Sequence, residues 1–300
     1  QRLRLAGSGH SISCSQKTKK ESEMNSKIIP AENEIKQSKK DLLAGIQPAV
    51  CYSGFRSGQH PDRGEGAVNP SNTEILEDLG ISSREMQFKL IRLYDSGENS
   101  QAVLRLIKEH NINIKVMLGI WLNAELSAHE TCAWLTEPIP QEELDENKKI
   151  NQKEIQRGID LANQYPEIVV AVNVGNESLV EWNDHKVDVD TIISYSKRVQ
   201  DAIQQPVTVA DNYVWWAEKG KKLADVLDFI SIHIYPVWEG KDIDEGLSYS
   251  IENVQMVRDS LPDATIVISE AGWASTASEF GERASPEKQL QHYNELMNWS

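Results

Sequence analysis

Two glutamates lie at the ends of apolar segments, in positions from which a pair of carboxylates could carry out chemistry. Residues 168–182 read IVVAVNVGNESLVEW, a run of strand-forming residues that leads into Asn176 and Glu177. Residues 264–273 read ATIVISEAGW, a second such run with Glu270 near its end. A single glutamate at a strand end is usually only a solvated residue. Two of them, each beside glycine and aromatic residues, indicate a site in which one carboxyl group donates a proton and the other acts as nucleophile or base.

Seven apolar segments that could position these glutamates alternate with amphipathic ones. The expected strands are residues 48–54, 88–95, 114–121, 168–175, 206–213, 228–236 and 264–273. Most are continuous apolar runs, which is typical of parallel strands buried on both faces. Helical patterns lie at 98–111, 151–165, 189–204, 248–261 and 285–299, with an acidic loop expected at 134–150. Repeated strand–helix alternation predicts parallel strands joined by right-handed crossovers.

Two architectures satisfy this alternation, an open doubly wound sheet and a closed barrel. A nucleotide-binding open sheet usually carries a glycine-rich phosphate loop after its first strand. Residues 52–66, YSGFRSGQHPDRGEG, contain neither G-x-G-x-x-G nor G-K-[ST]. We therefore expect an α/β fold, a (β/α)8 TIM barrel whose eighth strand is missing from the chain. Since residues 1–47 contain no such strand, the gene is expected to continue in frame beyond Ser300 and to encode it.

In a barrel the C-terminal ends of the strands meet at one mouth, which brings further side chains beside the two glutamates. Alternation along a strand places Asn173 and Glu177 on one face, provided that the strand stays regular to its end. A mid-strand arginine is rare without a buried partner, and Glu270 suits Arg92 because the pair would hold the carboxylate ionised. The other candidates at the mouth are Tyr94 on the face of Arg92, Trp121, Asn176, and His233 and Tyr235 on one face of their strand.

Glycoside hydrolysis is a reaction that uses two carboxyl groups and an aromatic-lined mouth without a metal or cofactor. One carboxyl group protonates the leaving oxygen, and the other attacks the anomeric carbon or activates water. In a retaining enzyme the two groups lie about 5–5.5 Å apart. The seven histidines and three cysteines show no metal-ligand spacing, so we expect neither a metal nor a cofactor.

Four motifs in this order, IRLYD, VNVGNE, HIYP and SEAGW, resemble glycoside hydrolase family 17, the β-1,3-glucanases of a retaining clan built on (β/α)8 barrels. The resemblance runs from about Ala49 to Ser300. The segments CYSGFR, GQHPD and YDSGENS are similar to those of bacterial laminarinase-like proteins. The chain departs from the family at Ala271 and Ala274, where Thr and Pro are frequent.

The resemblance implies a role for each matching residue. Glu177 would be the general acid/base, Glu270 the nucleophile that forms a glycosyl-enzyme, and Asn176 the partner of the sugar 2-hydroxyl. The resemblance also implies a surrounding substrate-binding set: Tyr94 and Tyr235 at the bond cleaved, Trp273 as a floor beside the nucleophile, and Arg92 behind Glu270. Position at a strand end adds Trp121 and His233 to the candidates. Of Trp215 and Trp216, one is expected to face a sugar and the other to pack.

These observations predict a retaining enzyme that cleaves internal β-1,3-glucosidic bonds of laminarin-like glucans. One alternative is a transglycosylase that uses the same residues and passes the sugar to another sugar instead of water. Another is a non-catalytic glucan-binding cell-wall protein that keeps the barrel as a cleft. A third is an unrelated barrel with a proton-abstracting glutamate, but such sites use Lys or metal-ligating acids at several strand ends.

Charge and composition limit the partners and divide the chain. A net charge of −15 argues against a nucleic-acid partner, and the absence of an apolar run of 18 residues argues against a transmembrane segment. Residues 1–47 carry 9 Lys and Arg against 5 Asp and Glu. We expect a disordered basic leader at 1–46 and a hydrolase domain at 47–300. Cys14 precedes Ser-Gln-Lys as in a lipid-attachment site, although residues 5–13 lack an apolar stretch.

The expected partner is a β-glucan polysaccharide or oligosaccharide, bound by a monomer. The expected location is extracellular, periplasmic or associated with the cell envelope.

Overall fold

The structure of the protein is a computed structural model that describes residues 2–4, 46–59 and 68–299. One sheet holds all the strands of this part of the chain, and their spatial order follows the sequence. The strands are β1 (Arg2–Arg4), β2 (Ile46–Cys51), β3 (Leu90–Arg92), β4 (Lys115–Ile120), β5 (Val169–Asn176), β6 (Val207–Asn212), β7 (Ile230–Ile234) and β8 (Ile266–Ala271).

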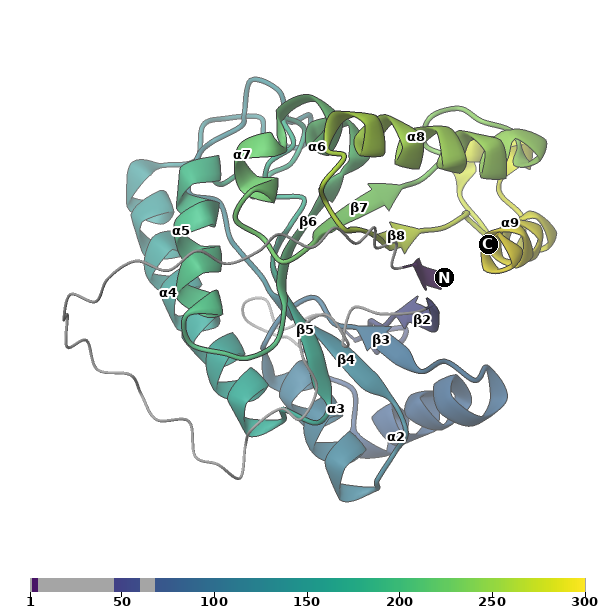
Figure 1. Cartoon of the computed structure of the whole chain (residues 1–300), viewed down its shortest axis with the longest axis horizontal. Helices are drawn as coiled ribbons and strands as arrows, with labels where there is room; N and C mark the ends of the chain where they lie inside the picture. Colours follow the sequence, from purple (N-terminus) through teal and green to yellow (C-terminus); the bar gives the residue numbers. More distant parts are fainter. Residues whose placement is uncertain (1, 5–45, 60–67, 300) are drawn as a thin grey trace, which may run out of the picture.

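The seven strands from β2 to β8 run parallel, each paired with the next, and curve into a barrel that is nearly closed (Figure 1). This confirms the TIM-barrel fold without its eighth parallel strand. β1 pairs antiparallel with β2 and lies against β8, between the two ends of the parallel series. Arg2–Arg4 of the expected leader thus form a strand, whereas Cys14 and the rest of residues 5–45 lie outside the described residues.

Helices cover the outer face of the strands (Figure 1). They are α2 (Asn72–Gly80), α3 (Glu98–Glu109), α4 (Gln141–Gln164), α5 (Val189–Gln200), α6 (Tyr213–Lys219), α7 (Lys221–Ala224), α8 (Gly246–Ser260) and α9 (Pro286–Asn298). Short segments of other helix types are η2 (Ile81–Glu85), η3 (Ile243–Glu245) and η4 (Ser278–Arg283). The prediction of a loop at 134–150 is wrong for its second half, because α4 begins at Gln141. Within the described residues, no helix has the length and apolar character that crossing a membrane requires.

The apolar residues form two layers. The larger cluster fills the space between the strands and the helices. A smaller cluster lies inside the barrel: Ala49, Leu90, Met117, Ala171, Phe229 and Val267. Most of them come from the first half of a strand, and Phe229 directly precedes β7, so they close the N-terminal end of the barrel interior. The C-terminal end is left to polar side chains, as in barrels whose active site lies at that face.

Irregular pairing in two strands brings polar residues onto the inner face. Between β7 and β8, Ser231 pairs with Val267 but His233 pairs with Glu270, so β8 holds one extra residue. A regular β8 would have placed Ser269 opposite His233 and turned Glu270 toward the helices. β5 shows a similar shift against β6 just before Asn176. Bulges of this kind re-aim side chains beside active sites.

Candidate active site

Glu177 follows β5 in a backbone conformation that a glutamate rarely adopts. Its φ is +50° and that of Gly175 is +81°, both in the left-handed region. For a non-glycine residue this costs about 1–3 kcal/mol and persists only where the surroundings impose it, commonly at functional sites. Here the Glu177 N–H donates to the Ala210 carbonyl (2.8 Å), and the Asn183 amide donates to the Glu177 carbonyl (2.8 Å). The turn leaves the Glu177 side chain 27% exposed at the mouth.

Glu270, in contrast, is almost enclosed. Arg92 forms an ion pair with its Oε1, and the Tyr235 hydroxyl donates to its Oε2 at 2.7 Å. Burial alone would raise the pKa of Glu270, but attraction to His233 and Arg92 and the hydrogen bond from Tyr235 outweigh burial and lower the pKa to about 2. Burial, with the charge of Glu270, raises the pKa of Tyr235, so that its hydroxyl remains a donor. The Glu270 carboxylate is therefore ionised at neutral pH.

His233 connects the two glutamates. It is fully buried, with Nδ1 2.9 Å from Glu177 Oε1 and Nε2 3.5 Å from Glu270 Oε1. One oxygen of each carboxylate lies within 4.8 Å of the other. Side chains at the ends of β5, β7 and β8 thus meet at one point, as the barrel mouth requires.

Arg92 holds two members of this cluster at once. Besides the ion pair with Glu270, its Nη2 donates to Asn176 Oδ1 at 2.6 Å. Because arginine offers only donors, the amide oxygen of Asn176 must face it, and the amide nitrogen is left to donate elsewhere. The Arg92 guanidinium lies 4.7 Å from the centre of the Tyr94 ring. Gly119 makes room for this arrangement, since a Cβ there would lie 2.2 Å from the Tyr94 carbonyl carbon.

The two predicted substrate-binding tryptophans flank the cluster. The Trp121 ring lies 4.6 Å from the His185 ring, and His185 Nε2 lies 2.8 Å from the Asn176 carbonyl oxygen. Trp273 is only 4% exposed, and its indole N–H donates to the Arg283 carbonyl at 2.7 Å. Trp121 therefore contacts the loop after β5, whereas Trp273 is anchored beyond Glu270 and forms part of a cavity wall.

Trp215 and Trp216 do not provide a sugar platform. Both are buried in α6, with their rings edge to face at 5.3 Å. The Trp216 indole N–H donates to the Ser231 carbonyl of β7 at 2.8 Å. The expectation that one of them faces a sugar is therefore wrong, because the short α6 directs both rings into the core.

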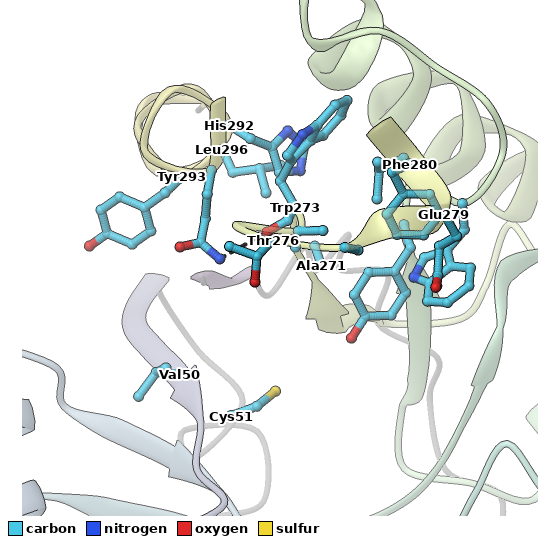
Figure 2. A pocket seen from close by; sticks show the side chains of 17 residues that line it. Val50, Cys51, Ala271, Trp273, Thr276, Glu279, Phe280, His292, Tyr293 and Leu296 are labelled. Carbon is cyan, nitrogen blue, oxygen red and sulfur yellow. Dashed lines mark hydrogen bonds between the residues drawn. The ribbon is translucent and has the colours of Figure 1, made fainter. Parts of the chain in front are cut away.

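Two cavities lie near this cluster, one lined by Tyr235 and the other by Tyr94. The larger has a volume of about 510 Å³ and includes Tyr235 and Trp273 in its wall. Figure 2 shows it bordered by His292, Tyr293 and Leu296 of α9 on one side and by Val50 and Cys51 of β2 on the other. The smaller cavity, of about 270 Å³, is lined by Tyr94, Trp121 and residues that include Phe55 and Asp95. Space for a ligand thus borders Tyr235, which contacts Glu270, and Tyr94, which stacks on Arg92.

Glu177, His233 and Glu270 also have the spacing of metal ligands, since one ligand atom of each lies within 4.8 Å of the others. Arg92 belongs to the same group: its Nη1 contacts Glu270 and lies 3.4 Å from His233 Nε2. Its permanent charge repels a second cation, and it takes up the carboxylate oxygen that a metal would need. We interpret the group as a Glu270 carboxylate held by the Arg92 cation, with His233 between it and Glu177.

Sequence reasoning missed three residues that hold the turn at Glu177: Asn183, His185 and Asp211. Asp211 is fully buried in β6, and its Oδ2 accepts the Leu179 N–H at 2.9 Å. A carboxylate inside the run VTVAD is as unusual as a mid-strand arginine, so a signal was present. Asn183 and His185 gave no signal, because their contacts depend on how the loop after β5 folds back.

The low pKa of Glu270 predicts a specific pH dependence of stability. Its pKa falls from the ordinary 4.5 to about 2 on folding, so the ionised pair contributes stability above pH 4.5 that is lost as the pH falls toward 2. The contribution is roughly 3 kcal/mol. Urea unfolding of the wild type should therefore lose roughly 3 kcal/mol more between pH 5 and pH 2 than unfolding of Glu270→Gln, which cannot titrate. Parallel curves for the two proteins would contradict the ion pair.

A parallel barrel whose mouth holds two closely spaced carboxylates, one strained and one buried against an arginine, has the architecture of a glycoside hydrolase. The family comparison agrees with this class. The model of the BtgE/BtgC glycoside hydrolase domain matches residues 49–300, and the chain belongs to this family. A comparison with curated protein sequences found no match.

Solved structures show the same fold. The endo-laminarinase from Formosa Hel1_33_131 is 22% identical, with a TM-score of 0.68 over 84% of this chain and 74% of that chain. An active-site mutant of the Rhizomucor miehei β-1,3-glucanosyltransferase in complex with laminaritriose is 18% identical, with a TM-score of 0.59 over 83% and 80%. The latter enzyme is described as a member of glycoside hydrolase family 17. The expected resemblance to that family is thus confirmed at the level of the fold and of a glycoside hydrolase domain.

Proposed function

We propose that this domain is a retaining enzyme that cleaves internal β-1,3-glucosidic bonds of laminarin-like glucans by double displacement. The observation that carries the proposal is the spacing of the carboxylates, because an oxygen of Glu177 and one of Glu270 lie within 4.8 Å. Retaining glycosidases hold their two groups about 5–5.5 Å apart, whereas inverting ones leave roughly 6.5–9.5 Å for a water molecule. The short spacing favours direct attack by one carboxylate.

Glu270 suits the role of nucleophile. Arg92 and Tyr235 keep its carboxylate ionised and fix both of its oxygens in one orientation. A nucleophile in a retaining enzyme must be unprotonated when the substrate binds, and the lowered pKa meets this requirement. Its enclosure also excludes the water that would otherwise solvate the charge.

Glu177 suits the role of general acid and base. Its side chain is the more exposed of the two, and it makes no ion pair with Arg92 that would bind it permanently as a carboxylate. The His233 imidazole, 2.9 Å away, fixes its orientation. A residue that gives up a proton and later recovers one needs this access to the leaving group and to water.

The reaction follows from these two positions. In the first step a Glu270 oxygen attacks the anomeric carbon, the bond to the glycosidic oxygen breaks, and Glu177 gives its proton to that oxygen. In the second step the Glu177 carboxylate removes a proton from water, whose oxygen attacks the anomeric carbon and releases Glu270 as a carboxylate. Asn176, whose amide nitrogen is left to donate, would bind the sugar 2-hydroxyl in both steps.

The substrate class rests on the relatives and on the shape of the mouth. One similar structure is an endo-laminarinase, and another holds laminaritriose. The two cavities, one lined by Tyr235 and the other by Tyr94, leave room for more than one sugar unit near the carboxylates, which suits attack inside a chain. The direct test is incubation with laminarin and analysis of the products by size. Short oligosaccharides of mixed length would support the proposal, and an unchanged polymer would contradict it.

Transfer to a second sugar is the competing outcome for the same intermediate. Trp238 is 63% exposed, packs edge to face against Phe280 at 4.7 Å, and lines the larger cavity together with Tyr235. The exposed indole face of Trp238 is suited to stack on a sugar, and it lies in the same cavity as Tyr235, the hydrogen-bond partner of Glu270. A sugar held there could intercept the glycosyl-enzyme in place of water.

Trp238→Ala is therefore expected to lower the ratio of transfer to hydrolysis. An aromatic contact is worth about 0.5–1.5 kcal/mol, so the ratio should fall about 3- to 10-fold. The measurement is the yield of products longer than a laminari-oligosaccharide substrate, relative to the shorter ones. Trp134→Ala is the matched control, because Trp134 is 72% exposed and lies outside the lining of this cavity. Equal ratios in wild type and Trp238→Ala would remove Trp238 from the acceptor site.

We also propose that the protein acts outside the cytoplasm and as a monomer. A β-glucan polymer supplied from the surroundings is too large to cross the cell membrane, and the mouth is built from one chain. Fractionation of the source cells with an antibody against the domain tests the location, and a signal confined to the cytosol would contradict it. Elution at the size of two or more chains on gel filtration would contradict the monomer.

A further inference from the structure

Asp211 lies where the fold calls for an apolar residue. In β6, Asp211 pairs with Ile232, and its neighbours on the same face are Val207 and Val209. Ile232, Val207 and Val209 all belong to the larger apolar cluster, between the strands and the helices. Asp211 itself is fully buried. A carboxylate in such a layer is costly to desolvate and is usually retained for a purpose other than packing.

The contacts of Asp211 lead to the turn that carries Glu177. Its Oδ2 accepts the Leu179 N–H at 2.9 Å, and its Oδ1 accepts the Asn212 N–H at 2.7 Å. The preceding residue, Ala210, accepts the Glu177 N–H at 2.8 Å. Two consecutive residues of β6 thus bind the turn: Ala210 binds the Glu177 N–H, and Asp211 binds the Leu179 N–H.

The strained conformation of Glu177 explains why such a clamp is needed. With φ at +50°, the turn would relax if its hydrogen bonds were lost, and the carboxyl group would move with it. A general acid must lie within hydrogen-bond reach of the glycosidic oxygen, and a displacement of about 1 Å can cost about 100-fold in rate. Burial, and to a smaller extent the charge of Glu177, raise the pKa of Asp211.

We propose that Asp211 is a positioning residue for the general acid: its carboxyl group holds the Leu179 N–H and thereby fixes the turn that aims Glu177 at the leaving oxygen. The proposal rests on the proposed function, because it assumes that Glu177 protonates a glycosidic oxygen. It extends that function to a residue outside the barrel mouth, on the helix-facing side of β6.

The test compares substrates that differ in their need for an acid. Phenyl β-laminaribioside has a poor leaving group and requires a proton, whereas the 2,4-dinitrophenyl glycoside releases a stable anion and does not. In Asp211→Ala, kcat/KM is expected to fall about 100-fold on the phenyl glycoside and less than about 3-fold on the dinitrophenyl one. Asp211→Asn keeps an oxygen for the Leu179 N–H and should recover at least about 10-fold of the loss.

Asp228→Ala is the matched control. The Asp228 carboxylate accepts the Val207 N–H at 2.8 Å, the same kind of bond at the opposite end of the same strand. Its removal should leave the ratio of the two kcat/KM values unchanged. Equal losses of kcat/KM on both substrates in Asp211→Ala would show that Asp211 has a merely structural role. No loss on either substrate would show that it has no role in the reaction. An Asp211→Asn variant as impaired as Asp211→Ala would also overturn the proposal.

Hydrogen exchange at the Leu179 amide separates this proposal from the proposed function, because it needs no substrate. Exchange is expected to be faster in Asp211→Ala than in the wild type and unchanged in Asp228→Ala. Unchanged exchange in Asp211→Ala would overturn the clamp even if the enzyme is active. If the wild type cleaves neither glycoside, the proposed function fails and the role of Asp211 in catalysis fails with it, while exchange still reports on the contact.

Discussion

Replacing Glu270 with Gln is expected to abolish turnover of laminari-oligosaccharides while leaving the glucan bound. Glutamine has nearly the same shape but cannot attack the anomeric carbon, so the step that forms the glycosyl-enzyme is lost. Removing a catalytic nucleophile of this kind costs about 10⁴-fold or more in kcat, as in other covalent mechanisms. Binding should persist, because Asn176, Trp121 and the cavity walls remain. The measurements are turnover by chromatography of the products and affinity by calorimetry.

The variant needs a control for folding, because Arg92 loses its buried partner. Removing one member of such a pair destabilises a protein by about 3–5 kcal/mol, so the thermal transition of Glu270→Gln must be shown to lie above the assay temperature. Glu279→Gln is the matched control, since Glu279 is an exposed glutamate of η4 that lines the larger cavity together with Tyr235 and forms no ion pair with Arg92. Turnover by a folded Glu270→Gln variant would refute the nucleophile assignment.

Glu177→Ala is expected to give the second largest effect, with a dependence on the leaving group. Loss of a general acid costs about 100- to 10,000-fold, and this should appear in kcat/KM for laminari-oligosaccharides and the phenyl glycoside. The 2,4-dinitrophenyl glycoside needs no proton, so its kcat/KM should stay within about 10-fold of wild type. For that substrate the second step becomes slow, because no base remains to activate water. Steady-state kinetics on both glycosides, with a burst of dinitrophenol, is the measurement.

Added azide provides an internal check on Glu177→Ala. As an anion it needs no base, so it should attack the glycosyl-enzyme, give a glycosyl azide and accelerate turnover. Glu181→Gln is the matched control: Glu181 lies in the same loop, 48% exposed, and pairs with Lys186 on the surface. Equal losses on both glycosides, or no response to azide, would contradict the acid/base role.

The repeating pattern of the chain was sufficient to predict the fold. Apolar runs, several of them rich in Val and Ile, recur seven times between amphipathic segments, and each contains a parallel strand. The period of 3.6 residues located α3, α5, α8 and α9, because their apolar faces meet the sheet. The start of α4 was missed, because its first turns are acidic and exposed and carry no apolar stripe.

The meeting of the candidate residues at one mouth was predictable, but their geometry was not. Their positions at the ends of expected barrel strands made Glu177, Glu270 and Asn176 candidates. Strict alternation, however, turns Glu270 away from the barrel interior, and only the extra residue in β8 brings it opposite His233. A bulge depends on how two strands pair, and that information is not local to either segment.

The left-handed turn at Glu177 escaped prediction for the same reason. It requires Ala210 and Asp211 from β6 and Asn183 from the following loop, all distant in sequence or fixed by the loop's own folding. The assumption of a regular strand from Asn173 to Glu177 is therefore wrong. In the folded chain the Asn173 side chain donates to the Gly175 carbonyl at 2.7 Å, which stabilises the irregular end of β5.

Trapping of the covalent intermediate tests the central claim most directly. A 2-deoxy-2-fluoro β-laminaribiosyl fluoride carries a good leaving group, and its fluorine slows both steps, the second enough for the glycosyl-enzyme to accumulate. Mass spectrometry of the intact protein should show one added fluorosugar unit, located after digestion on the peptide that contains Glu270. The Glu270→Gln variant should show none. Release of fluoride ion without a protein–sugar adduct would contradict the double-displacement mechanism proposed for this site. An adduct on a peptide other than the one that contains Glu270 would contradict it as well.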